Sequence, residues 1–450
     1  VQLGSNEAAL TAEESVDEAT AARFRRSLDA RLTRTLRRQK VKSVPNPPPQ
    51  DPAMVKLGQS LFFDKELSGP RSIACSTCHN PFLGTADGQT LSRAQGAVGL
   101  GASRRHGPLS LFLPRNALTL WNRGVEGWDT MFWDGRLGED ENGNFFSPAG
   151  AATPQGFTNA LAAFTIIPVT PREEMRGFVD EPDRFGDFNE LGTIADDDFV
   201  GIWDGVVNRV RAIPTYQEQI RAAFPGRTIE EFGIVELSNA VGAFETHAFT
   251  ALDSPFDRFL AGDRSAMSNA AKRGALLFYG RANCASCHQG ALQTDFSFHN
   301  IAAPQVGTGR PGFEPLDIGR AEQTGLPEDR FDFRTPSLRN VRLNGPYFHN
   351  GAYNSLEDAV RHHLDPAGSL AVYDDSQVEP ELQGTFQDDP ALIAELVRTV
   401  DPSLRVRGRP LRESEISDIM AFLDALTDPS SLNLFDTIPD EVASSLPLAD

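Results

Sequence analysis

The chain has 450 residues, of which 40% are hydrophobic and 23% are charged, and this near-average composition excludes wholesale disorder. Its 42 Lys and Arg residues against 62 Asp and Glu residues give a formal net charge of −20, which disfavours binding to nucleic acids or anionic membranes. No apolar run is long enough to cross a bilayer, so the sequence predicts no membrane span.

The predicted elements divide the chain into four parts, the first of which is an N-terminal extension over residues 1–50. Thr11 and Glu14 form a capping-box pattern, and the stretch up to about Arg38 is rich in Ala, Arg and Glu, which favours a helix. The proline-rich run over 45–52 then marks a boundary.

The remaining parts are two larger domains and a short acidic tail. Apolar residues recur at helical spacing in several stretches, and little strand-like alternation is present, so the fold is predicted to be mainly α with long loops. The helical stretches lie near 206–210, 234–249 and 391–400. The predicted domain boundaries are 51–253, 254–428 and, for the tail, 429–450.

The four cysteines form two pairs of identical spacing, and a histidine follows each pair. CxxCH is the attachment signature of c-type haem: the two thiols bind the porphyrin and the histidine becomes the proximal iron ligand. A redox CxxC would sit near a βαβ pattern, and a zinc site across about 200 residues would leave the histidines unexplained. The two copies are Cys75-Ser-Thr-Cys78-His79 and Cys284-Ala-Ser-Cys287-His288.

The two motifs therefore predict two covalent haem c groups, and this prediction indicates where in the cell the protein is found. No basic-then-apolar leader opens the chain, which fits either a cytoplasmic protein or the mature form of an exported one. Because haem c is attached outside the cytoplasm, we expect a mature periplasmic or extracellular protein.

The segment before each CxxCH motif also repeats. Gly58 and Phe62 precede the first motif, and Gly274 and Phe278 precede the second, each pair lying on one face of a helix. Glycine at this position permits close approach of a second helix, which for the second domain is predicted over 414–426. The repeat indicates duplicated cytochrome c domains.

Several segments together resemble one family, the bacterial di-haem cytochrome c peroxidases and their MauG relatives. They occur in family order over about residues 51–428, and neither the N-terminal extension nor an insert over 137–167 is covered. The matching segments are Leu57–Asp64, Arg115–Thr119, Phe132–Arg136, Glu174–Met175, Ser254–Leu260, Phe333–Asn340 and Pro346–Gly351.

The resemblance implies that the first haem, with His79 as its proximal ligand, reacts with peroxide. Glu174 falls where the family carries its distal acid, with the adjacent Glu173 as the alternative, and would move a proton from the near to the leaving oxygen of peroxide. Burial would raise the pKa of this carboxyl. Trp133 would lie between the haems as an electron relay, and Phe132 would line the distal pocket.

Further ligands follow from the same resemblance. Asn116, with the carbonyl groups of Asn344 and Pro346, matches a calcium site between the domains, and oxygen ligands suit that ion. His106 lies near a loop histidine that caps the first iron in the resting state of many relatives, although a solvated loop histidine is an equal alternative.

The second haem has His288 as its proximal ligand. The far-side ligand in the family is Met in the peroxidases and Tyr in the MauG branch, whereas the corresponding position here is His363, beside His362. Because neighbours on a helix point roughly 100° apart, only one of the two can bind the iron. We expect His363, with His362 as the alternative, and a lower potential than with His/Met ligation.

The resemblance implies an enzyme that reduces hydrogen peroxide to water, with electrons arriving through the second haem from a small donor protein. An acidic surface would favour a basic, cytochrome-like donor, and a two-fold homodimer is the general expectation for soluble proteins. The alternative is a MauG-like enzyme that uses peroxide to oxidise side chains of a partner protein. A di-haem electron carrier is the non-enzymatic alternative, but it leaves Glu174 and Trp133 without a role.

Overall fold

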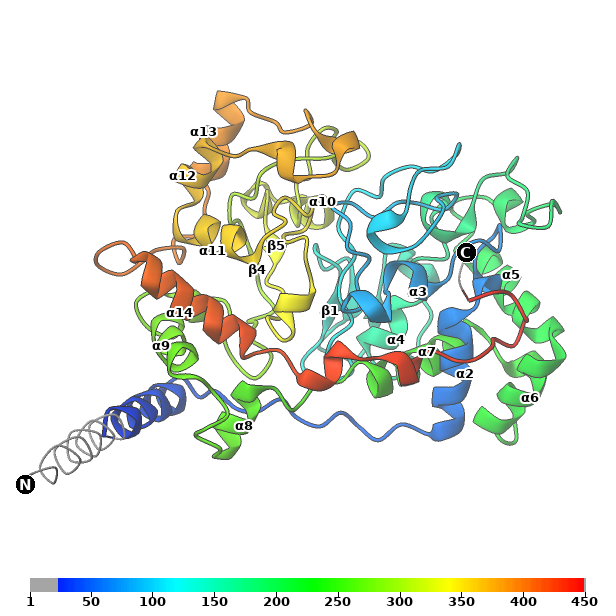
Figure 1. Ribbon diagram of the computed structural model, residues 1–450. Helices are drawn as coiled ribbons and strands as arrows, with labels where there is room; N and C mark the ends of the chain where they lie inside the picture. The colour runs from blue at the N-terminus through cyan, green and yellow to red at the C-terminus, as the bar shows by residue number, and fades with distance from the viewer. Residues whose placement is uncertain (1–22, 449–450) are drawn as a thin grey trace, which may run out of the picture.

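The computed structural model describes residues 23–448, in which helices joined by long irregular segments predominate (Figure 1). This confirms the mainly α expectation, whereas the capping pattern of Thr11 and Glu14 lies outside the described residues. Across residues 23–448, none of the helices combines the length and the apolar character that a membrane crossing requires.

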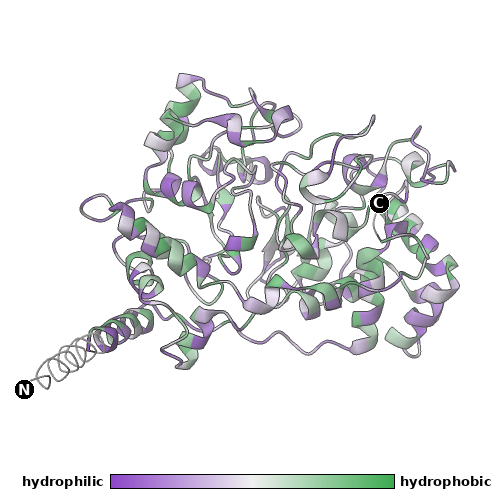
Figure 2. Cartoon of the chain, in the orientation of Figure 1, coloured by the Kyte–Doolittle hydropathy of each residue, from purple (hydrophilic) through white to green (hydrophobic). Residues whose placement is uncertain are grey.

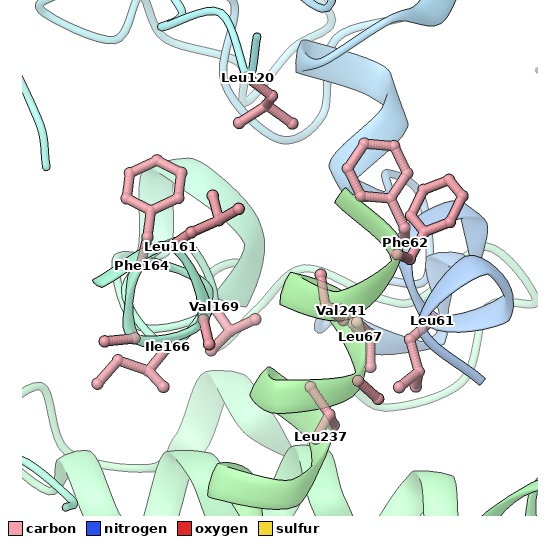
Figure 3. Close-up of a cluster of buried hydrophobic side chains, with 14 of the residues drawn as sticks. Leu61, Phe62, Leu67, Leu120, Leu161, Phe164, Ile166, Val169, Leu237 and Val241 are labelled. Carbon is pink, nitrogen blue, oxygen red and sulfur yellow. The ribbon is translucent and has the colours of Figure 1, made fainter. Parts of the chain in front are cut away.

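The first haem domain is centred on the crossing of α2 (Pro52–Phe63) and α7 (Ile234–Ala248). The Asp51 side chain caps α2 by accepting hydrogen bonds from its first backbone amides. A Cβ atom on Gly58 would lie 1.8 Å from the Ala240 carbonyl oxygen, so only glycine permits this approach. Figure 3 shows the apolar side chains that the crossing and the neighbouring segments bury.

The second domain repeats the arrangement with α9 (Asn269–Phe278) and α14 (Glu413–Asp424). Here a Cβ on Gly274 would lie 1.8 Å from the Asp418 carbonyl oxygen. The predicted partner helix over 414–426 and the role of the repeated glycine are both confirmed. Phe278 and Phe422 pack edge to face in the core beside this crossing, with ring centroids 5.1 Å apart.

The other helices and the short strands frame these two crossings. Two small antiparallel sheets occur, one of β1, β2 and β3 and one of β4 and β5. The helical stretches expected near 206–210, 234–249 and 391–400 are found in α5, α7 and α13. The bounds are α3 (Cys75–Cys78), β1 (Thr130–Met131), β2 (Leu137–Glu139), β3 (Phe145–Phe146), α4 (Ala160–Phe164), α5 (Phe199–Ala212), α6 (Pro214–Ala223), α8 (Pro255–Ala261), β4 (Phe298–His299), α10 (Ala321–Thr324), β5 (Phe333–Arg334), α11 (Leu356–Leu364), α12 (Pro366–Ala371) and α13 (Pro390–Arg398).

A helix over residues 23–38 packs on the second domain, far from the first in sequence. Leu32 and Leu36 are buried in that domain's core, and Asp29 forms an ion pair with Lys272 at 2.7 Å. Figure 2 shows hydrophobic and hydrophilic residues alternating around this helix, as expected for one packed face and one exposed face.

The C-terminal segment runs from α14, in the second domain, back to the first domain and packs on it (Figure 1). The Ser444 hydroxyl donates to Asp64 at 2.7 Å, and Leu434 and Val442 join that domain's apolar core. The acidic tail predicted over 429–450 is therefore, over its described residues, a packed part of the fold. The four-part division itself stays a prediction.

Candidate active site

Each CxxCH motif lines one of two cavities. The first cavity is bounded by Cys75, Cys78 and His79 together with residues from the loops after α3. The second is bounded by Cys284, Cys287 and His288. Both cavities are mainly apolar, as expected of a site for a large flat cofactor.

The two motif histidines are held in the tautomer that a metal ligand requires. The Nδ1 atom of His79 lies 3.2 Å from the Thr85 carbonyl oxygen, and that of His288 lies 3.1 Å from the Gln293 carbonyl oxygen. Because a carbonyl only accepts hydrogen bonds, each Nδ1 carries the hydrogen and each Nε2 keeps its lone pair free for iron.

His363 lines the second cavity opposite His288 and has the same tautomer. Its Nδ1 donates to the Ala359 carbonyl oxygen at 2.7 Å. The ring centroids of His288 and His363 are 6.3 Å apart. An iron bound between two imidazoles, with bonds of about 2 Å, would hold the centroids roughly 6 Å apart, so the residues present fit a haem with two histidine ligands.

His362, the alternative ligand, turns away from the second cavity. Its Nδ1 lies 2.9 Å from the Tyr353 hydroxyl, and its Nε2 lies 2.8 Å from the Ile301 carbonyl oxygen. Both ring nitrogens are therefore engaged in hydrogen bonds. The geometry favours His363 over His362 as the ligand.

Glu174 lines the first cavity from a single π-helical turn, Arg172–Arg176, whereas its neighbour Glu173 is exposed. Turns of this type are frequent at functional sites. Burial raises the pKa of Glu174, although the positive charges of Arg136 and Arg310 oppose the rise. The geometry favours Glu174 over Glu173 as the acid of this cavity.

Phe132 and Trp133 connect the two cavities. Phe132 lines the first one with a left-handed backbone (φ 64°), and its carbonyl oxygen accepts a hydrogen bond of 2.9 Å from Arg334. Trp133 lines both cavities, and its indole nitrogen donates to the Asn116 carbonyl oxygen at 3.1 Å. A single aromatic side chain thus bridges the two candidate haem sites.

The insert over 137–167, outside the family resemblance, completes the wall of the first cavity. It carries β2, β3 and α4, and α4 packs on α7. The Phe164 ring centroid lies 6.3 Å from that of His79 and 4.7 Å from that of Phe132. The insert therefore shapes the pocket around the proximal histidine.

His106 is not among the residues that line the first cavity. Its Nδ1 pairs with the Ser110 hydroxyl at 3.1 Å, and its ring packs edge to face on Phe112 at 4.3 Å. In this conformation the structure does not bring His106 to a ligand position, which agrees with the alternative of a loop histidine.

Asn116 and Asn344, two of the three residues expected at a calcium site, differ in the hydrogen bonding of their side chains. The Asn116 amide nitrogen donates to the Gln89 carbonyl oxygen at 2.7 Å. The Asn344 side-chain oxygen is buried and has no hydrogen-bond partner, a property that suits an oxygen ligand of a hard cation. Asn344 caps the C-terminus of the 3₁₀ helix Val341–Leu343, and Pro346 follows two residues later.

Glu245 is a cavity residue that the sequence reasoning missed. It projects from α7 into the first cavity, where burial raises its pKa to about 8 and its Oε2 atom has no hydrogen-bond partner. An acid within the apolar face of the 234–249 helix was the sequence signal that could have found it.

His299 lines the second cavity, where it lies between two carboxylate groups. It lies between Asp295 and Asp401 at 2.9 and 2.6 Å, and its hydrogen bonds, above all the one to Asp295, raise its pKa. The side chains of Cys287, Asp295 and His299 lie close enough together to bind a metal ion, but a thioether bond to haem would occupy the Cys287 sulfur.

The fold and the two histidine-bearing cavities define a c-type cytochrome with two haem sites, and comparisons with known proteins agree. A family model described as di-haem cytochrome c peroxidase matches residues 52–265. The methylamine utilization protein MauG of Methylorubrum extorquens is 33% identical over 325 residues, which cover 72% of each chain. The cytochrome-c peroxidase IdrP1 of Denitromonas iodatirespirans is 30% identical over 343 residues, covering 70% of this chain and 74% of the relative.

The chain belongs to the di-haem cytochrome c peroxidase and MauG family. It is an oxidoreductase acting on peroxide. A crystal structure of a MauG-like protein associated with microbial copper homeostasis has the same fold, with a TM-score of 0.60, 23% identity and coverage of 89% of this chain and 97% of that one.

Proposed function

We propose that the protein is a di-haem c-type peroxidase that reduces hydrogen peroxide to water with electrons delivered through the second haem. The haems would be held by the two CxxCH motifs, with His79 and His288 as proximal ligands and His363 as the far-side ligand of the second. When bound, they supply electron exchange and, at the first site, a coordination position for peroxide.

The observation that carries the proposal is the placing of an acid and an aromatic bridge around the first cavity. Glu174 faces that cavity, and Trp133 lines this cavity and the second one. Glu174 takes the proton from the near oxygen of peroxide and returns it to the leaving oxygen, which departs as water. Trp133 lies on the path along which electrons pass between the cavities.

The first experiment separates Glu174 from its neighbour. Removing a general acid–base group lowers a rate by about 10²- to 10⁴-fold, so Glu174→Gln lowers the second-order rate constant for peroxide by that factor. Glu173→Gln, one residue away and exposed, is the matched control and leaves the rate constant unchanged. Equal rates in the two variants would refute the role of Glu174.

The donor and the calcium ion belong to the same proposal. Electrons come from a small donor protein outside the cytoplasm, and the net charge of −20 favours a basic one, so turnover slows as salt is added. Asn116, with the Asn344 and Pro346 carbonyl groups, would hold calcium between the domains; the unpartnered Asn344 side-chain oxygen is available as well. Chelation followed by calcium analysis of the holoprotein tests this part.

A second candidate function is MauG-like oxidation of side chains on a partner protein. The observation that favours it is the histidine opposite His288, because this ligand, which also differs from the tyrosine of the MauG branch, is not the methionine of the peroxidases. Incubation with peroxide and each purified candidate partner distinguishes the two. A covalent mass change in a partner supports the MauG-like activity, and donor oxidation at two electrons per peroxide supports the peroxidase.

A further inference from the structure

Tyr353 and His362 form a buried hydrogen-bonded pair behind the second cavity. The Tyr353 hydroxyl lies 2.9 Å from the His362 Nδ1 atom, and Tyr353 is 5% exposed. The His362 Nε2 atom faces the Ile301 carbonyl oxygen at 2.8 Å, and a carbonyl can only accept. Nε2 therefore carries the ring hydrogen, Nδ1 has the free lone pair, and the Tyr353 hydroxyl is the donor.

Aromatic rings connect this pair to the second cavity. Phe348 lines the cavity, and its ring centroid lies 5.4 Å from that of His363 and 5.1 Å from that of Tyr353. The same ring also lies 5.1 Å from His362. Tyr353 is thus separated from the proposed iron ligand by one phenyl ring.

The run of rings continues from Tyr353 outward to the surface. Tyr373 lies 5.5 Å from Tyr353 between ring centroids, is half-buried, and donates its hydroxyl hydrogen to the Ala352 carbonyl oxygen at 2.7 Å. It lines a surface pocket between α12 and α13, beside Phe386, and its neighbour Val372 is 79% exposed. In Figure 1 these helices lie on the same side of the molecule as α11, which carries both histidines.

A tyrosine that loses an electron becomes a strong acid, so its proton must leave at the same time. In an apolar interior this requires a base already within hydrogen-bond reach, about 2.6–3.2 Å. The Nδ1 atom of His362 is such a base, held in place by the Ile301 carbonyl oxygen. Among the five tyrosines, Tyr353 has both this partner and ring contacts that lead from a cavity to the surface.

We propose that Tyr353 is a redox-active tyrosine, the relay through which electrons from a surface donor reach the second haem site by way of Tyr373. The proposal rests on the proposed function, because peroxide supplies the oxidant. Peroxide takes up two electrons and two protons to give two water molecules. In each of two events, Tyr353 gives one electron toward the second site and its phenolic proton to His362 Nδ1. One electron from the donor and the return of that proton restore the phenol.

The test follows the radical and not turnover alone. The holoprotein is labelled with ring-deuterated tyrosine, mixed with one equivalent of peroxide without donor, frozen and measured by EPR. We expect an organic-radical signal whose hyperfine pattern changes with the label. Tyr353→Phe, which removes only the hydroxyl, loses this signal at least about tenfold and slows donor oxidation, while the initial reaction with peroxide keeps its rate.

Tyr279→Phe is the matched control. Its hydroxyl is also buried and hydrogen-bonded, to Gln293 at 2.8 Å, but the residue lies in the second domain's core at the end of α9, and its partner is a side-chain amide. This variant keeps the signal. A signal that ignores the tyrosine label, or that survives in Tyr353→Phe, would overturn the proposal. Mapping of spin-trap adducts in the unsubstituted protein gives a readout that needs no variant, and an adduct on Tyr353 is expected.

A second oxidant separates failure of the relay from failure of the proposed function. If peroxide leaves the spectrum of the unsubstituted holoprotein unchanged, the peroxidase proposal fails. The relay is then decided by a photo-oxidised ruthenium complex in solution. Under that oxidant a Tyr353 radical that forms more slowly in heavy water supports the relay, and absence of the radical refutes it.

Discussion

The crossing of α9 and α14 makes a stability prediction whose sign opposes simple helix propensity. In an exposed helix, Gly→Ala stabilises by about 1 kcal/mol, because alanine loses less backbone entropy on folding. In Gly274→Ala the new Cβ would lie 1.8 Å from the Asp418 carbonyl oxygen and 2.4 Å from its carbon. These are backbone atoms that no side-chain rotation can move.

The magnitude follows from the contact that must open. Ordinary van der Waals contact needs about 3.5 Å, so the two helices must separate by more than about 1.5 Å locally. The crossing buries Ile419 and Phe422 at 1% and 0% exposure, and its tight packing cannot absorb that shift. Overpacking costs about 1–3 kcal/mol, and with the upper end of this range the net loss after the helix gain is about 2 kcal/mol.

Thermal unfolding of the holoprotein, followed by far-UV circular dichroism, measures the effect. For a domain of this size, a loss of that order lowers the midpoint by roughly 4–8 °C. Gly205→Ala on α5 is the matched control, because its Cβ would meet only side-chain ends of Leu191 and Ile194, at 2.6 and 3.4 Å. Its midpoint stays level or rises. A midpoint for Gly274→Ala at or above that of the unsubstituted protein would refute the reasoning.

Three further predictions concern charge and ligation. Peroxide deprotonation needs the Glu174 carboxylate, and burial raises the pKa of this group. The rate constant for peroxide, measured by stopped flow, therefore falls with acidification at a pH above the usual glutamate range. In Glu174→Gln this fall is absent. His363→Met raises the potential of one haem in a redox titration, whereas His106→Met, outside both cavities, leaves both potentials unchanged. Arg339→Leu leaves the buried Asp257 carboxylate, now 2.9 Å from the guanidinium, without its ion-pair partner and costs about 3–5 kcal/mol, read from the urea midpoint.

Much of the scaffold could be predicted because its determinants are local. A CxxCH motif fixes the ligand and its attachment points within one turn, and a glycine 17 residues before the first motif and 10 before the second indicates a helix crossing. A close helix contact was therefore predictable at both Gly58 and Gly274, and the partner helix was predicted for the second domain. The paths of the chain ends were not, because the helix over 23–38 and the segment around Ser444 each pack on the domain remote from them in sequence.

Glu245 shows why part of the site remained hidden. Its helix is otherwise apolar on the buried face, and periodicity predicts burial without revealing whether a cavity lies beside it. Whether a buried acid faces a core or a pocket depends on segments from elsewhere in the chain, here α3, which carries Cys75, and the loop that carries Arg136. The same holds for Trp133, whose contact with both cavities requires the two domains to be in place.

The adjacent histidines on α11 show what tertiary contacts add to a helical position. On a helix the side chains of His362 and His363 point roughly 100° apart, so at most one of them can face the second cavity. The choice depends on carbonyl groups: that of Ala359 leaves the His363 Nε2 atom free toward His288, while that of Ile301 binds the His362 Nε2 atom and leaves Nδ1 for Tyr353. One turn of helix thus offers a metal ligand and a proton acceptor side by side. Moving either carbonyl would exchange or remove those roles without any change in the sequence of the turn.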